Sequence, residues 1–202
     1  MEIEAKFALA DRAALQRLQT LACLGGFSLL PARVRQVRDT YLDTADRRIL
    51  AAGYSCRRRE QSEGILVTLK ALTRPADAVH RRQEWQALLA ADMPPAAWPA
   101  GPLRDQVLQL IGEAPLAPWI ELSQVRHVRP VMRDEQAVAE LSLDEVRLAA
   151  ADTEQAYFEL EVELLDEGSA EDLAAIMGCL RTEWGLRAEP RSKFERALAL
   201  LH

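Results

Sequence analysis

The chain has 202 residues and a formal net charge of −6, with 49% hydrophobic and 28% charged residues. This composition is typical of a folded globular protein and argues against a disordered chain. The length predicts a single domain over residues 1–202, with two small domains as the alternative. The acidic net charge gives no general footprint for nucleic acid, and no apolar stretch approaches the roughly 20 residues that cross a bilayer, so neither nucleic acid nor a membrane is an expected partner.

The cysteines and the first residues indicate the cellular compartment. Cys23, Cys56 and Cys179 are too few and too scattered for a disulfide framework or a zinc site. Glu2 and Glu4 stand where a signal peptide would carry basic residues. We therefore expect a reduced, cytoplasmic setting.

The N-terminal half alternates strands with one helix. Alternation of apolar and polar residues predicts a strand at 2–9, and a stripe of leucines predicts a helix at 12–24 that ends at a Gly-Gly pair. A strand at 34–42 follows. The segments 54–60 and 65–72 flank a short polar turn, which predicts a hairpin.

The rest of the chain, from residue 79 onward, carries the remaining strands and most of the helices. A strand is predicted at 79–88, then a Pro-rich connection and a helix at 103–111. Ser169 opens a capping box that predicts a helix to about residue 184, and a last helix is expected at 192–201. Between the helix at 103–111 and Ser169, three more strands are predicted at 120–133, 137–148 and 156–165.

Eight strands of similar length, mostly joined by local connections, are typical of an antiparallel sheet that closes on itself. The helices fall between and after the strands, so they can cover the outer face. We therefore predict an α+β fold: an eight-stranded antiparallel β-barrel, a tunnel, with helices packed on the outside.

Charged residues alternate with apolar ones in nearly every predicted strand. Side chains two residues apart share a face of a strand, so Glu2, Glu4 and Lys6 lie together, and so do the three glutamates of 159–163. For any single strand, the simpler interpretation is that the ionic face meets solvent and the apolar face forms the core. Taken together, however, the ionic faces are dominated by arginine and carboxylates while lysine is scarce, which favours an interior lined by charges.

Such an interior must be hydrated and its charges paired or metal-bound, because burying unpaired charge costs several kcal/mol per group. Val146 is expected opposite Asp144, with an irregularity near the end of that strand. The predicted acidic lining is Glu2, Glu4, Glu84, Glu140, Asp144, Glu159, Glu161 and Glu163. The predicted basic lining is Lys6, Arg57, Arg59, Lys70, Arg82, Arg126 and Lys193.

This lining indicates the chemistry of the interior. Stacked carboxylates repel and raise one another's pKa unless a cation lies among them, and hard divalent ions such as Mg2+ and Mn2+ take oxygen ligands of this kind. The planar fork of arginine can hold two phosphate oxygens at once. The sequence therefore predicts binding of a phosphate chain with divalent metal. His80, His127 and His202 are too dispersed to form a site, and we expect surface or structural roles for them.

Six short motifs carry a family resemblance. They are Glu2-x-Glu4-x-Lys6, the turn from Tyr41 to Asp46, Arg57-x-Arg59, Thr68-x-Lys70, Glu159-x-Glu161-x-Glu163 and the segment from Ser192 to Arg196. In this order they resemble the CYTH family, the triphosphate tunnel metalloenzymes, over essentially the whole chain, and most of all the CYTH domain of bacterial inorganic triphosphatases. The resemblance implies an eight-stranded tunnel, one or two Mg2+ or Mn2+ ions and a small-molecule triphosphate substrate.

The resemblance also implies roles for individual residues. It implies catalytic roles for Glu4, Glu161 and Lys6. The implied metal ligands are Glu2, Glu4, Asp144, Glu159, Glu161 and Glu163. The implied phosphate-binding residues are Lys6, Arg57, Arg59, Lys70, Arg82, Arg126 and Lys193. Arg129 and Arg147 are additional candidates of the same kind.

Members of this family differ in what occupies the tunnel mouth. Aromatic residues make up only 5% of this chain, which leaves little for stacking a base, so we expect hydrolysis of inorganic triphosphate (tripolyphosphate) to pyrophosphate and phosphate. The alternatives among enzymes are a class IV-type adenylate cyclase and a thiamine or nucleoside triphosphatase. A non-catalytic polyphosphate-binding module is an alternative of another class, and Glu4 and Glu161 argue against it because binding alone needs the bases more than the acids.

The resemblance to bacterial triphosphatases also bears on assembly. In that group a helical CHAD domain follows the CYTH domain, so a longer parent chain could carry one. The segment around Trp98 and the strand at 158–165 contribute to this resemblance. The sequence leaves open whether the protein is a monomer or a homodimer.

Overall fold

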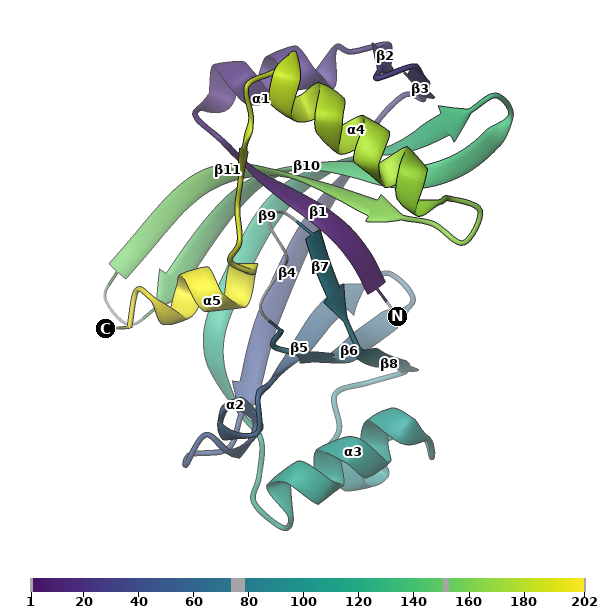
Figure 1. Cartoon of the computed structure of the whole chain (residues 1–202). Helices are drawn as coiled ribbons and strands as arrows, with labels where there is room; N and C mark the ends of the chain where they lie inside the picture. Colours follow the sequence, from purple (N-terminus) through teal and green to yellow (C-terminus); the bar gives the residue numbers. More distant parts are fainter. Residues whose placement is uncertain (1, 74–78, 151–152, 202) are drawn as a thin grey trace.

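An antiparallel sheet curves into a barrel around a central space (Figure 1). The computed structural model describes residues 2–73, 79–150 and 153–201. Within these ranges twelve strands join one sheet, whose main path runs β12-β1-β11-β10-β9-β4-β5-β6-β8. The strands are β1 (Glu2–Leu9), β2 (Cys23–Leu24), β3 (Phe27–Leu29), β4 (Arg33–Asp43), β5 (Tyr54–Gln61), β6 (Gly64–Ala71), β7 (Val79–Arg82), β8 (Glu84–Leu89), β9 (Ala117–Arg133), β10 (Gln136–Ala150), β11 (Thr153–Leu164) and β12 (Arg187–Ala188). The α-helices in the same ranges are α1 (Arg12–Gln19), α2 (Arg48–Ala51), α3 (Pro102–Ile111), α4 (Ala170–Thr182) and α5 (Lys193–Leu198).

The barrel closes through a bend in a single segment. β7 pairs with β1, whereas β8 pairs with β6 at the other end of the path. Only Gln83 separates β7 from β8, so this segment joins the two ends of the sheet. The strand predicted at 79–88 is therefore two short strands that belong to different walls. The predicted α+β barrel of antiparallel strands with helices outside is confirmed.

Two of the predicted helices are too long. α1 ends at Gln19, and β2 and β3 form a small hairpin where the last turn of the predicted helix would lie. Gly25 and Gly26 have φ of 57° and 90° and form the turn of this hairpin, since glycine adopts positive φ without strain. α5 likewise ends at Leu198 and does not reach residue 201.

Side-chain caps fix where three helices begin. Asp11 Oδ1 accepts a hydrogen bond from the Ala14 N–H (2.8 Å) at the start of α1. Capping boxes that begin at Ser169 and Ser192 open α4 and α5. Each such cap stabilises a helix by about 1 kcal/mol. The cap at Ser192 places Lys193 as the first residue of α5.

Apolar layers cover the outside of the barrel. α1 and α4 pack over β1, β10 and β11 around the fully buried Phe7, Leu143 and Leu160 (Figure 1). α3 packs against β5, β6 and β8 around Leu69 and Val107. No helix in the described ranges has the length and apolar character needed to span a membrane.

A third apolar cluster fills one end of the barrel. The pairing of β10 with β9 and β11 runs without a break from Ala139 to Ala149, so Val146 shares the inner face with Asp144. The expectation that Val146 lies opposite Asp144 is therefore wrong. Val146 belongs to a buried cluster with Leu122 and with Phe194 of α5. Tyr41 and Phe194 of this cluster also line the charged cavity, so the cluster borders that cavity.

Candidate active site

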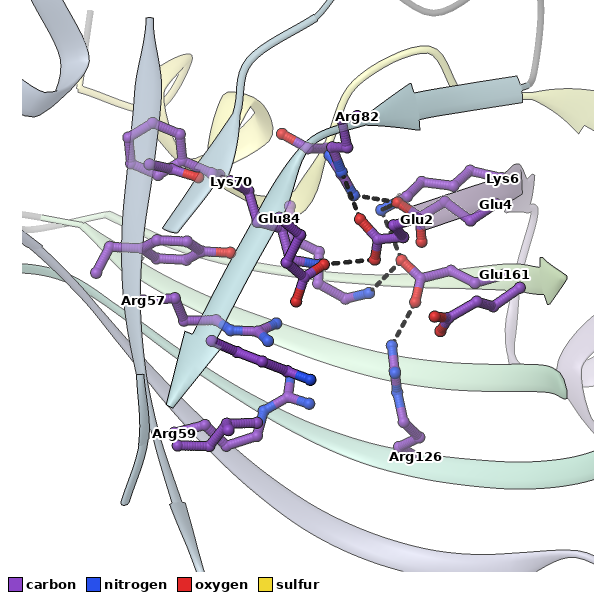
Figure 2. A pocket seen from close by; sticks show the side chains of 18 residues that line it. Glu2, Glu4, Lys6, Arg57, Arg59, Lys70, Arg82, Glu84, Arg126 and Glu161 are labelled. Carbon is purple, nitrogen blue, oxygen red and sulfur yellow. Dashed lines mark hydrogen bonds and ion pairs between the residues drawn. The ribbon is translucent and has the colours of Figure 1, made fainter. Parts of the chain in front are cut away.

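Charged side chains from opposite walls of the barrel converge on a cavity of about 400 Å³ (Figure 2). All seven residues expected to bind phosphate line it, and so do four of the six expected metal ligands. The other two, Asp144 and Glu159, lie behind the cavity surface and are fully buried. The ionic residues that line the cavity are Glu2, Glu4, Lys6, Arg57, Arg59, Lys70, Arg82, Glu84, Arg126, Glu161, Glu163 and Lys193.

β1 presents Glu2, Glu4 and Lys6 to the interior. Glu2 accepts hydrogen bonds from Lys70 Nζ (2.6 Å) and Arg82 Nε (2.8 Å). Glu4 pairs with Arg82, and its Oε1 lies 3.4 Å from Lys6 Nζ. Burial raises the pKa of Glu2, but Lys70 and Arg82 outweigh burial and hold this pKa at about 2. Glu2 therefore stays ionised at neutral pH and orients two cations of the neighbouring strands.

A buried aspartate that the sequence analysis missed supports the two arginines of β5. Asp39 has no exposed surface, and it accepts two parallel hydrogen bonds from Arg59, Nε–Oδ1 at 2.7 Å and Nη2–Oδ2 at 2.8 Å. Arg57 Nη1 lies 3.7 Å from Asp39 Oδ2. Burial raises the pKa of Asp39, but Arg57 and Arg59 lower it by more than burial raises it, so the net shift of this pKa is downward. Asp39 faces Arg59 in the β4–β5 register, which is the signal that could have found it.

Three carboxylates meet at the base of the cavity. One ligand oxygen from each of Asp144, Glu159 and Glu161 lies within 4.8 Å of the others. β10 and β11 bring them together, because Asp144 faces Glu159 in their register and Glu161 follows on the same face. We call Asp144, Glu159 and Glu161 the acidic triad.

Cations surround the acidic triad. Lys193 Nζ lies 3.0 Å from Asp144 Oδ2 and 2.8 Å from Glu161 Oε1, and it also contacts Glu159. Arg126 donates to Asp144 through Nε (2.8 Å) and Nη2 (2.6 Å) and also pairs with Glu161. Burial disfavours the charge of Glu161, but Lys193, Lys6 and Arg126 outweigh burial and bring its pKa well below the usual range. Burial dominates at Glu159 and raises its pKa.

The acidic triad fits a divalent cation. Its donors are carboxylate oxygens, which are the ligands that Mg2+ and Mn2+ prefer. Both carboxylate oxygens of the buried Glu159 lack a hydrogen-bond partner among the described residues, although Lys193 is in ionic contact. Glu2, Glu4 and Glu163 do not belong to this group of three. Glu2 and Glu4 instead pair with lysine and arginine side chains in this structure.

A second cavity of about 560 Å³ adjoins the first and shares Arg59, Arg126 and Glu163 with it. Glu140, which the sequence analysis expected inside the tunnel, lines this second cavity. Burial, together with repulsion from Glu2 and Glu4, raises the pKa of Glu163 to about 7. The second cavity therefore extends the first on a side that α5 does not line.

The remaining candidates lie outside the cavity. Arg129 donates to backbone carbonyls of Leu30 (2.8 Å) and Gln19 (3.2 Å), so it anchors the end of α1. The side chain of Arg147 is 75% exposed. His80 is buried beside β1, as expected for a structural residue. His202 lies outside the described residues.

Comparison with known proteins places this fold among relatives. The sequence profile of the CYTH domain matches residues 1–198. The structure is similar to HpAC1 from Hippeastrum, which is described as having a dominant triphosphatase activity (TM-score 0.74, 18% identity, covering 98% of this chain and 96% of that chain). It is also similar to a Bacillus halodurans protein provisionally described as an adenylate cyclase (TM-score 0.64, 22% identity, covering 97% of this chain and 96% of that chain). A third similar structure is the Mimivirus capping enzyme triphosphatase (TM-score 0.52, 11% identity, covering 87% of this chain and 86% of that chain).

A search of curated proteins finds no match. The structural likenesses, all below 25% identity, show the tunnel fold alone. The CYTH profile, in contrast, extends over nearly the whole sequence and includes the strands that present the acidic triad and the arginines. The chain belongs to the CYTH family.

Proposed function

We propose that this protein hydrolyses inorganic triphosphate to pyrophosphate and phosphate inside its tunnel, with Mg2+ or Mn2+. The observation that carries the proposal is one cavity in which a cluster of cations meets a group of carboxylates. Seven cationic side chains line the cavity together with five glutamates, and the acidic triad lies at its base. A short phosphate chain matches the cations, and a divalent cation matches the carboxylates.

The cationic residues supply the grip on the phosphate chain. Arg57 and Arg59 hold their guanidinium groups over the cavity because Asp39 fixes them from behind. Lys6 and Arg126 approach from β1 and β9, next to Glu161. Fixed cations of this kind stabilise the charge that spreads over the phosphate oxygens during transfer, without reorganising in the reaction.

The reaction needs a water molecule and no covalent intermediate. Water attacks the terminal phosphorus and loses a proton to solvent, the bond from that phosphorus to the bridging oxygen breaks, and pyrophosphate leaves with the bridging oxygen and the electron pair of that bond. A divalent cation on the acidic triad would lower the pKa of a bound water and offset charge on the phosphate oxygens. Glu4 and Glu161 lie where they can orient such a cation and water, and Lys6, which contacts both, neutralises the transferred phosphoryl group.

The lining of the cavity supports an inorganic substrate. The aromatic side chains on its surface are Tyr41 and Phe194, and both are packed into the apolar cluster at one end of the barrel. The rings of Tyr41 and Phe194 also contact each other in a tilted arrangement, with centroids 4.8 Å apart. The described lining therefore offers little for stacking a nucleotide base.

A substrate panel tests this proposal. Phosphate release from tripolyphosphate with Mg2+ or Mn2+ should exceed release from ATP or thiamine triphosphate many-fold. EDTA should abolish the release, and adding either metal back should restore it. Equal rates on tripolyphosphate and ATP would refute the substrate assignment.

The same panel separates the alternatives. Formation of cyclic AMP and pyrophosphate from ATP would identify a cyclase, an activity for which the Bacillus halodurans relative is provisionally described. Tight binding of tripolyphosphate without turnover under either metal would identify a binding module.

A further inference from the structure

Lys193 occupies the place where a metal would bind. Its ammonium lies within 3.0 Å of Asp144 Oδ2 and 2.8 Å of Glu161 Oε1 and also contacts Glu159, so it touches every member of the acidic triad. These are the same carboxylates whose oxygens lie within 4.8 Å of one another. Lys193 is itself buried, with 6% of its surface exposed. An ammonium and a divalent cation cannot both use these oxygens at close range.

The charges around the acidic triad already balance. Three carboxylates face three cations, because Lys6 pairs with Glu161 (2.6 Å) and Arg126 pairs with Asp144 in addition to the contacts of Lys193. A divalent cation added to this arrangement would leave two positive charges in excess in a buried site, which is costly. One of the three cations must therefore leave the acidic triad when a metal binds.

Lys193 is the cation that can leave. Lys6 and Arg126 belong to β1 and β9, which are paired with neighbouring strands over their whole contact with the site. Lys193 is the first residue of a six-residue helix and belongs to no paired strand. Its long side chain also borders the cavity in which the phosphate chain would lie, so rotation of its side-chain bonds can carry the ammonium from carboxylates to phosphate.

We propose that Lys193 is an exchangeable counter-ion of the acidic triad: it neutralises the three carboxylates in the metal-free protein and is displaced into the cavity when a divalent cation binds. This inference rests on the proposed metal dependence. It explains how three buried carboxylates persist without metal, and it couples metal binding to the delivery of one more cation to the phosphate chain.

Calorimetric titration of Mg2+ into the purified protein, without any phosphate compound, tests the exchange. Lys193→Met removes the competing charge and should bind Mg2+ at least about 10-fold more tightly than the wild type, which is a difference of about 1.4 kcal/mol. Lys193→Arg keeps a competing charge and should stay within about 3-fold of the wild type, less than 1 kcal/mol. Arg191→Met is the matched control, because Arg191 carries the same charge on the same segment but pairs with Glu189.

A second measurement uses the unaltered protein and does not depend on whether Lys193→Met folds. Amine acetylation followed by mass spectrometry should show faster labelling of Lys193 as Mg2+ is added, because an ammonium held by three carboxylates is protected. Lys6 is the internal control, since it keeps its contact with Glu161 and its labelling should not increase.

The outcomes distinguish this proposal from the proposed function. Magnesium binding with equal or weaker affinity in Lys193→Met, or with unchanged Lys193 labelling, would overturn the exchange while leaving the metal dependence intact. Hydrolysis of tripolyphosphate that persists in EDTA, with no magnesium binding to either protein, would overturn the metal dependence itself.

Discussion

At the scale of single residues, the site is organised by carboxylates that hold cations in place. Asp39 illustrates this best, because it forms ion pairs with both Arg57 and Arg59 and orients their guanidinium groups. Its complete burial means that its negative charge persists only because Arg57 and Arg59 compensate it. Removal of that charge should therefore disturb binding more than chemistry.

Asp39→Asn should raise KM for tripolyphosphate by about 10- to 100-fold, because a hydrogen bond to a charged group contributes roughly 1.5–3 kcal/mol and Arg59 loses its fixed orientation. The change in kcat should be much smaller. Steady-state kinetics measure the split between KM and kcat. Asp46→Asn is the control, since Asp46 forms an exposed pair with Arg48 and should leave both constants unchanged; an unchanged KM in Asp39→Asn would contradict the positioning role.

Glu4 and Arg57 should separate turnover from binding. Glu4→Gln keeps the size of the side chain but removes a charge next to Lys6 and Arg82, so we expect turnover to be lost while tripolyphosphate binding largely persists. Arg57→Ala removes a phosphate contact and should weaken binding and turnover together. Rates of tripolyphosphate hydrolysis and calorimetric affinities for tripolyphosphate, measured on both variants, test these two roles. Normal turnover in Glu4→Gln would show that Glu4 is not a catalytic residue.

At the scale of elements, α5 packs an aromatic side chain, Phe194, into the apolar cluster next to the cavity. Phe194 is 3% exposed and packs against Tyr41 at 4.8 Å and Trp119 at 5.8 Å between ring centroids. Burial of such a side chain contributes about 1.5–3 kcal/mol. The same packing fixes the position of the neighbouring Lys193, so a structural contact and a site residue share one short helix.

Phe194→Ala should lower the free energy of unfolding by about 3 kcal/mol, at the lower end of the range for such truncations because α5 can undock locally. Urea denaturation followed by circular dichroism measures the loss. Leu30→Ala is the control, because Leu30 is 43% exposed and its truncation should cost less than about 0.5 kcal/mol. A loss equal to that of the control would show that α5 does not stabilise the barrel.

The elements also show what the sequence could predict. Alternation located the strands and assigned Lys6 and Glu161 to the ionic faces of their own strands, because a period of two assigns side chains to a face without knowledge of the neighbours. It could not predict that Gln83 divides one strand between two walls, since that depends on the closure of the whole barrel. Asp39 was missed for the same reason: its importance comes from the strand opposite, and a single strand does not reveal its register.

At the scale of the whole molecule, the ionic interior makes stability depend on pH. The pKa values of Glu2, Asp39 and Glu161 are all lowered, in each case because neighbouring lysines or arginines outweigh burial. Carboxyls with a lowered pKa in the folded state contribute stability above their unfolded pKa, and this contribution is lost as the pH falls toward the folded value. Protonation of the interior therefore favours unfolding.

The melting temperature should accordingly fall steeply between about pH 4.5, the ordinary pKa of a glutamate, and pH 2, close to the pKa of Glu2 in the folded protein, which is about 2. Thermal melts in EDTA at a series of pH values measure this, and Glu2→Gln should flatten the acid limb. The same slope in Glu2→Gln and the wild type would show that Glu2 does not contribute.

The apolar cluster around Phe194 bears on how a substrate enters the cavity and how products leave it. Because α5 and this cluster fill one end of the barrel with apolar side chains, we expect a polyanion to enter, and its products to leave, on the side where the second cavity adjoins the first. If the protein hydrolyses triphosphate as proposed, departing pyrophosphate would meet the same arginines as the next triphosphate, so release of product is expected to compete with entry of substrate.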